Sequence, residues 1–211
     1  MLIQTIQPQS ILSVIKKEGI IYARADFEQY EKSTPSWGFS DAYAWMKEQM
    51  INKGLGSKCK SKDLFWAWAW SGDLGKKAID LRTRKSHNLK GQMVLTLEKS
   101  DILLSDFELW HYVLNYWPIA LSSKEENYWN KISETNNNFY ENKPLKDKDL
   151  DEKIRKTWQN IFKIKKEKDY FTYSFSKSVN KYLESESRKL VVQATFWNIK
   201  ESDIVSIKLI N

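Results

Sequence analysis

The sequence lacks features that several protein classes need. It has a single cysteine, Cys59, which excludes an internal disulfide and a metal cluster built from cysteines alone. No apolar run approaches the roughly 20 residues of a membrane-spanning helix. The N-terminus shows no charged segment followed by an apolar one, so we expect no signal peptide. Together these absences predict a protein without a membrane span, located in a reducing cytoplasm.

Common catalytic and nucleotide-binding motifs are also missing. The sequence contains no Gly-x-Gly-x-x-Gly, no phosphate-loop lysine motif and no Gly-x-Ser-x-Gly, although folds without these motifs stay open. Its only histidines are His87 and His111. A Glu-x-x-His spacing occurs once, at Glu108 and His111, whereas a di-metal site on facing helices needs two copies. We therefore expect no metal site.

Tryptophan and positive charge are abundant instead. The 211 residues include ten tryptophans and are 41% hydrophobic, which is enough for the core of one domain. The formal charge is +7, from 34 basic and 27 acidic side chains. This excess favours a polyanionic partner, such as a nucleotide, a nucleic acid or an acidic protein. The preference is modest because acidic residues are interspersed among the basic ones.

Short strands and helices follow one another without a sustained β-α-β repeat. The chain opens with a strand, a helix ended by Gly19 and a second strand, over residues 2–24. Alternating large and small residues predict a strand at 64–70 with its three tryptophans on one face. Further strands are expected at 92–97, 102–104, 190–197 and 204–210, and helices at 42–52, 105–117, 124–132 and 151–162. The basic run 163–168 is expected to be a solvated face or loop, and 198–202 a turn. This order of elements predicts one α+β domain with a mixed, mainly antiparallel sheet and packed helices. Charged loops or insertions are expected near 134–150 and 163–188.

The densest specific chemistry lies between residues 103 and 118. Ser105 and Glu108 have the spacing of a helix capping box, and Pro118 supplies a stop. On the helix between them, one stripe of apolar residues consists of Phe107, Trp110, Leu114 and Trp117. Such a helix is typical of a cleft wall, and equally of a core helix with a structural histidine.

A polar row runs along the edge of that stripe. Glu108, His111 and Asn115 are three and four residues apart and are therefore neighbours on a helix. His111 is the preferred general acid or base, with Asp106 or Glu108 as its proton partner. A histidine bonded to a nearby carboxylate, amide or backbone group in a structural role is the commonest alternative.

Other residues are candidates for substrate binding. Arg24 and Arg82 would position phosphates or ribose, and Asn115 would add a contact. Trp68 would stack on a base, although a plain central strand under a helix explains the same pattern. The basic segment 76–90 is either a phosphate-facing loop or a solvated connection.

Several short segments spread along the chain are similar to those of a known family. They are Thr5–Gln7, Ala44–Met46, Trp66–Trp68, Asp80–Arg82, Leu104–Phe107, Trp110–Asn115, Trp158, Ile161–Phe162 and Gln193–Trp197. Through these segments the chain resembles a bacterial family known only as a domain of unknown function, number 3841. The resemblance covers nearly the whole chain and implies no established activity.

A second resemblance is to mono-ADP-ribosyltransferases. Residues 2–24 and 190–210 are similar to the opening and closing strands of their catalytic domains. The resemblance implies NAD as a cofactor candidate and Gln193 as the catalytic candidate on the late strand. Where that family has a histidine or arginine on the first strand, this chain has Thr5 and Gln7, and the late strand has Gln193 and Thr195 but no carboxylate.

Two functions follow as hypotheses. The first is a cytoplasmic enzyme that acts on a nucleotide or nucleic acid, in a toxin or phage-defence setting, with His111, Asp106, Glu108 and Gln193 as catalytic candidates. The second is a non-enzymatic module whose lysines and tryptophans bind nucleic acid or an acidic protein. The second would bind in a strongly salt-dependent way and would be insensitive to loss of His111.

Overall fold

The computed structural model describes residues 1–23, 39–56, 63–71, 81, 90–136, 139, 145–168, 170–186 and 190–210. Two predicted substrate-binding residues, Arg24 and Arg82, lie outside these ranges, as do Cys59, His87 and most of the basic segment 76–90.

Helices and strands alternate along the described chain. The strands are β1 (Leu2–Pro8), β2 (Ile20–Tyr22), β3 (Phe65–Ser71), β4 (Gln92–Glu98), β5 (Leu103–Asp106), β6 (Ile164–Lys166), β7 (Phe171–Tyr173), β8 (Val191–Phe196), β9 (Asn198–Lys200) and β10 (Ile204–Ile210). The helices are α1 (Ile11–Glu18), α3 (Phe39–Asn52), α4 (Phe107–Leu114), α5 (Ser123–Thr135), α6 (Lys148–Trp158) and α7 (Lys177–Ser185), with short 3₁₀ helices η3 (Gln159–Phe162) and η4 (Glu201–Asp203).

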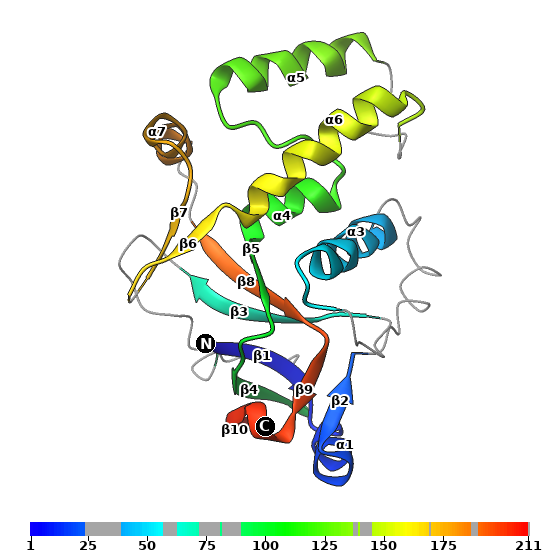
Figure 1. Cartoon of the computed structure of the whole chain (residues 1–211), viewed down its shortest axis with the longest axis vertical. Coiled ribbons are helices and arrows are strands. Elements are labelled where there is room, and N and C mark those ends of the chain that lie inside the picture. The colour runs from blue at the N-terminus through cyan, green and yellow to red at the C-terminus, as the bar shows by residue number, and fades with distance from the viewer. Residues whose placement is uncertain are drawn as a thin grey trace.

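A six-stranded sheet in the order β10-β4-β1-β3-β8-β5 forms the centre of the molecule (Figure 1). Two smaller ladders, β2-β9 and β6-β7, flank it, and every pairing among the described strands is antiparallel. Helices α3 to α6 gather near the β5–β8 edge, and α1 lies at the opposite end of the molecule. The predicted α+β class with a mainly antiparallel sheet is confirmed.

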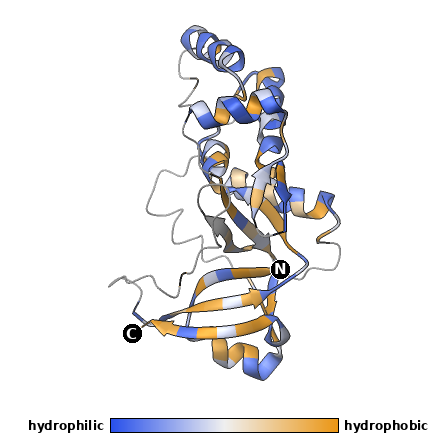
Figure 2. Ribbon diagram, turned by 90° about the vertical axis from the view of Figure 1, so that its left-hand side faces the viewer, coloured by the Kyte–Doolittle hydropathy of each residue, from blue (hydrophilic) through white to orange (hydrophobic). Residues whose placement is uncertain are grey.

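Strand alternation divides the core between the two sides of the sheet. On β8, Val192 and Ala194 belong to one apolar cluster, whereas the hydroxyl of Thr195 faces Met50 of α3 in the other. We call the first the sheet-side core; it consists mainly of strand residues and Ile15 of α1. The helix-side core joins α3, α4, α5 and α6. Figure 2 shows the contrast between hydrophobic strands at one end and the largely hydrophilic α5 at the other.

The structure corrects the predicted start, stop and buried face of α4. The N-cap is Asp106, whose Oδ1 accepts the backbone N–H groups of Glu108 (2.8 Å) and Leu109 (3.4 Å), and Ser105 belongs to β5. The helix ends at Leu114, four residues before Pro118, with Asn115 as C-cap. Its buried residues are Leu109, Trp110 and Val113, and the predicted stripe shares only Trp110 with that set. The buried face is centred on Leu109 and Val113, with Phe107 and Leu114 half-buried, and Trp117 lies beyond the end of the helix.

Two segments expected as loop or turn hold short strands. Within 163–168, the lysine-rich β6 pairs with β7, and within 198–202, β9 pairs with β2. The charged segment 163–188 therefore contains β6, β7 and α7. The partner of β9 is distant in sequence, whereas β6 and β7 are consecutive strands that form a hairpin. In both cases strand pairing outweighs the local preference for a solvated loop.

Candidate functional site

A row of mostly polar residues crosses the whole central sheet on its helix side. The strand registers place each member opposite the next: Ser206, Thr96, Gln4, Trp68, Gln193 and Ser105. We call these six residues the polar row. Gln4 Nε2 donates to Thr96 Oγ1 (3.2 Å), and Gln193 Nε2 donates to Ser105 Oγ (3.1 Å). Side-chain amides therefore bridge neighbouring strands inside the molecule.

Asp106, the residue after Ser105, is a buried carboxyl group at the junction of β5 and α4; in the sheet it lies opposite Val192 and not opposite a member of the polar row. One oxygen, Oδ1, caps the helix, and the other, Oδ2, accepts the hydroxyl of Tyr173 from β7 at 2.5 Å. Burial raises the pKa of Asp106 to about 6, although the hydrogen bonds from Tyr173, Leu109 and Glu108 act to lower it. A carboxyl group with such a pKa exchanges its proton near neutral pH, which suits it to proton transfer or to sensing pH.

The predicted row of Glu108, His111 and Asn115 lies on the exposed side of α4. His111 Nδ1–H donates to the Phe107 carbonyl oxygen at 2.9 Å, because a carbonyl can only accept. Asn115 Nδ2 donates to the His111 carbonyl oxygen at 2.7 Å. These side-chain contacts stay within α4, and the hydrogen bond from this row to Asp106 is made by the backbone N–H of Glu108.

A chain of aromatic contacts nevertheless connects His111 to the polar row. The His111 ring stands edge-on to Phe107 at 4.5 Å, and Phe107 stands edge-on to Trp68 at 4.7 Å. Trp68 lies opposite Gln193 in the sheet. Of the predicted site residues, the structure thus places Gln193 opposite Trp68, with His111 two rings further out, whereas Asp106 lies opposite Val192 and contacts Tyr173.

The sheet divides next to Trp68. Strand β1 pairs with β4 along its whole length, but its pairing with β3 is limited to Gln4 opposite Trp68. Beyond that point lies a cavity of about 390 Å³, which we call the split cleft. Its volume is within the range of about 300–1,000 Å³ that is typical of small-molecule sites. The residues that line it are Thr5, Ile6, Gln7, Ala23, Leu64, Phe65, Trp66 and Trp68.

Hydrogen bonds fix the polar groups of the split cleft. Gln7 Nε2 donates to Thr5 Oγ1 at 2.8 Å, and that hydroxyl donates to the Trp66 carbonyl oxygen at 2.7 Å. This relay joins β1 to β3 where their backbones separate. It holds an amide and a hydroxyl, two groups that can both donate and accept hydrogen bonds, at the cleft.

Neighbouring rings hold the two tryptophans of the split cleft in place. Trp66 packs edge-on against Tyr43 of α3 at 5.5 Å and lies 5.0 Å from Trp110 of α4. Trp68 is held by Phe107, as described above. Both rings are half-buried, so they are fixed by the core and still reach the cavity.

Several of these residues could be anticipated from the sequence and others could not. Trp68, Asp106 and Gln193 were singled out, and Thr5 and Gln7 were noted as the polar residues of the first strand. Tyr173 was missed as a partner, because it lies 67 positions from Asp106 along the chain. In the described part of the chain, no group of three or more His, Cys, Asp or Glu side chains could hold a metal ion.

Comparisons with known proteins identify a family but no activity. No curated protein and no solved structure matches the chain, so the resemblance to ADP-ribosyltransferases has no support from them. Over the residues that the structure describes, no helix combines the length and apolar character needed to cross a membrane. The family model described as "Domain of unknown function (DUF3841)" matches residues 2–205. The chain therefore belongs to the DUF3841 family.

Proposed function

We propose that the protein binds a nucleotide in the split cleft. The observation that carries this proposal is the pair of fixed tryptophans, Trp66 and Trp68, beside the relay of Gln7 and Thr5. An indole ring stacks on any base, and such stacking contributes about 1–3 kcal/mol per base. The Gln7 amide, which uses one N–H on Thr5, has a carbonyl oxygen and a second N–H that can pair with the donors and acceptors at a base edge.

Charge supports a nucleotide over a neutral aromatic ligand. The chain carries a formal charge of +7, which raises the local concentration of phosphates. Ala23 lines the cleft and is followed in sequence by Arg24, the residue that the sequence marks for phosphate or ribose.

The proposal concerns binding and not a reaction. Among the described residues that line the split cleft, none carries a carboxyl, imidazole or thiol group. Transferase chemistry on NAD, or another reaction in a toxin or phage-defence setting, would need such a group there. Asp106, the buried carboxyl group at the start of α4, does not line the cleft.

A thermal-shift panel tests the proposal. Mononucleotides, dinucleotides including NAD, and short RNA and DNA are added to the full chain, and the midpoint of unfolding is measured. We expect one or more nucleotides to raise the midpoint. Trp68→Leu, which removes the stacking ring, should weaken binding about tenfold or more.

Trp117→Ala is the matched control, because it removes a tryptophan that lies outside the split cleft. This variant should bind the nucleotide as the wild type does. A shift with RNA or DNA alone, lost steeply with salt and unchanged in Trp68→Leu, would instead support the non-enzymatic nucleic-acid module. No shift with any nucleotide would overturn the proposal.

A further inference from the structure

A second pocket, of about 220 Å³, lies where the end of α4 meets α5 and α7. It is separate from the split cleft and shares none of its residues. We call it the aromatic pocket because four rings line it together with the carboxylate of Glu126. The rings are those of Tyr112, Trp117, Trp129 and Tyr182.

The rings of the aromatic pocket differ in orientation and in how far they are exposed to solvent. Tyr112 and Trp117 are nearly perpendicular, at 80°, with centroids 6.0 Å apart. Trp129 is 8% exposed, whereas Trp117 is 39% exposed. The Tyr182 hydroxyl donates to Glu126 Oε2 at 3.1 Å, which ties α7 to α5 beside the pocket. The pocket therefore has a fixed inner ring, an accessible outer ring and an anionic group.

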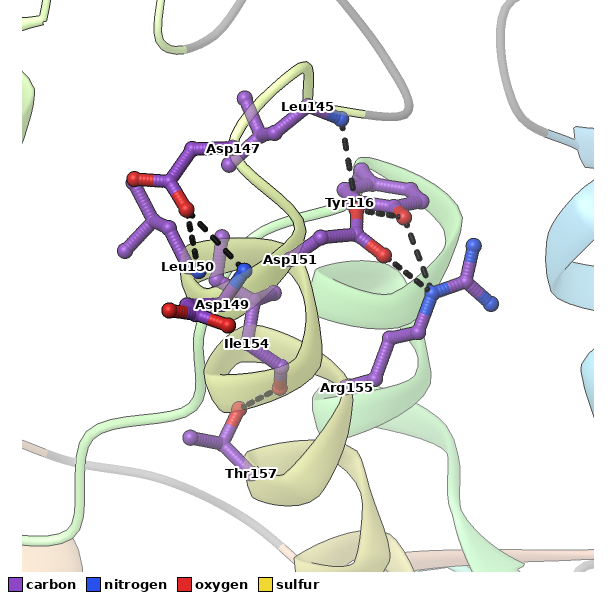
Figure 3. Close-up of polar contacts among 9 residues, drawn as sticks. All are labelled: Tyr116, Leu145, Asp147, Asp149, Leu150, Asp151, Ile154, Arg155 and Thr157. Carbon is purple, nitrogen blue, oxygen red and sulfur yellow. Dashed lines mark hydrogen bonds and ion pairs between the residues drawn. The ribbon is translucent and has the colours of Figure 1, made fainter.

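A turn with strained backbone geometry immediately precedes Trp117, the more exposed ring of the pocket. Tyr116 has φ 59°, a left-handed conformation that is costly for a residue with a side chain. Its hydroxyl bonds Asp151 of α6, and Arg155 Nε donates to the same hydroxyl at 3.0 Å and to Asp151 at 2.9 Å (Figure 3). This network holds the turn, because both partners project from one rigid helix.

The backbone of the next residue is fixed on both sides. The Trp117 N–H donates to the Tyr112 carbonyl oxygen at 2.7 Å, and Trp158 Nε1 donates to the Trp117 carbonyl oxygen at 2.9 Å. The main chain of Trp117 is thus set by bonds to α4 and α6, while its ring stays partly in solvent. An exposed indole on a strained and well-supported turn is a feature to be expected at a binding site.

We propose that the aromatic pocket binds a methylated ammonium group. The faces of Trp and Tyr rings attract cations, and the carboxylate of Glu126 adds charge of the required sign. Methylated nitrogen fits best, because ring faces offer few acceptors for the N–H groups of a primary ammonium and Glu126 already accepts from Tyr182. The site is independent of the proposed nucleotide cleft.

Calorimetric titration of the full chain with matched ligands tests this proposal. Choline is compared with 3,3-dimethylbutan-1-ol, which has the same shape without the charge. We expect choline to bind about tenfold or more tightly than the neutral analogue. A peptide with trimethyllysine, beside its unmodified form, tests a protein source of the same group. Tighter binding of either methylated probe supports the proposal, and their ratio indicates whether the natural source is a side chain or a small molecule.

Variants locate the binding. Trp117→Ala and Glu126→Gln should each weaken choline binding about fivefold or more. The controls are Tyr170→Ala, which removes a ring that is also 39% exposed but lies elsewhere, and Glu134→Gln on the same helix α5. Both controls should bind as the wild type, and circular dichroism confirms that each variant is folded. Equal binding of the neutral analogue, or no binding of choline and of the trimethyllysine peptide, would overturn the proposal.

Discussion

A single carboxyl group, that of Asp106, combines a structural task with an unusual proton affinity. It caps α4 through one oxygen and accepts the Tyr173 hydroxyl through the other. Both contacts favour the charged form, yet burial outweighs them and the pKa rises to about 6. The folded protein therefore retains a proton that the unfolded chain, with an ordinary carboxyl pKa of 3.8, releases at lower pH.

This difference predicts how stability depends on pH. Because the folded pKa lies above the unfolded one, the contribution of Asp106 is greatest below about pH 4, falls as the pH rises toward 6, and is constant above that. A shift of about two units corresponds to a loss of about 3 kcal/mol. In Asp106→Asn, which keeps a cap oxygen and can donate to Tyr173, this loss should be absent.

Urea unfolding of the wild type and Asp106→Asn across this pH range measures the difference. The stability of the Asn variant relative to the wild type should rise by about 3 kcal/mol between acid and neutral pH. Glu108→Gln, a change at an exposed carboxylate next to the cap, should show no such rise. A constant difference between wild type and Asp106→Asn at every pH would contradict the assignment.

The same residue shows how far sequence reasoning reached at the site. Asp106 was named as a proton partner, but the Ser-x-x-Glu spacing assigned the cap to Ser105. In the structure the Ser105 hydroxyl accepts from Gln193, a contact across 88 positions. Tyr173 lies 67 positions from Asp106. Local spacing cannot indicate such partners, because strand pairing brings them together.

At the scale of elements, segments whose apolar residues recur with a clear helical or strand period were assigned correctly from the sequence. The helix expected at 42–52 is α3, which buries Ala42, Trp45, Met46, Gln49 and Met50. In strand β3, Trp66 and Trp68 line the split cleft while Ala67 and Ala69 belong to the sheet-side core, and Gly19 ends α1 with φ 72°. Helix α7 was missed although Ser176 caps it, because it is only nine residues long and buries only Leu183.

A buried lysine joins two of these elements. Lys99, directly after β4, has a side chain 1% exposed, with Nζ 2.8 Å from Asp203 of η4 and 3.0 Å from Asp101. It also lies over the ring of Phe196 at 5.4 Å. Lys99→Ala leaves Asp203, which is 14% exposed, without this cation, and we expect a loss of about 3 kcal/mol in the free energy of unfolding.

Denaturant unfolding with a matched lysine provides the comparison. Lys156 forms a pair with Glu152 along α6, but both side chains are largely exposed, at 72% and 67%. Lys156→Ala should therefore cost far less than Lys99→Ala. Equal losses in the two variants would show that the buried cation does not stabilise the junction.

For the whole molecule, the decisive feature is that the two cores share strands. Leu103 of β5 belongs to the helix-side core and its neighbour Leu104 packs on the sheet-side core. At the end of β8, Phe196 belongs to the sheet-side core and the next residue, Trp197, to the helix-side core. Neither core can lose these strands alone, so we expect the predicted single domain to unfold in one step.

Leu95→Ala tests this cooperativity, because Leu95 is fully buried in the sheet-side core. The change should cost about 2–5 kcal/mol. Tryptophan fluorescence reports chiefly on the other core, since the described residues of the sheet-side core include no tryptophan, whereas the helix-side core contains or contacts Trp45, Trp66, Trp110, Trp129, Trp158 and Trp197. If the cores unfold together, Leu95→Ala lowers the midpoint equally by fluorescence and by far-ultraviolet circular dichroism. Ile154→Ala, on the helix side, should behave in the same way. A fluorescence midpoint unmoved by Leu95→Ala would mean that the chain unfolds as two units, because the strands shared between the cores would then fail to couple them.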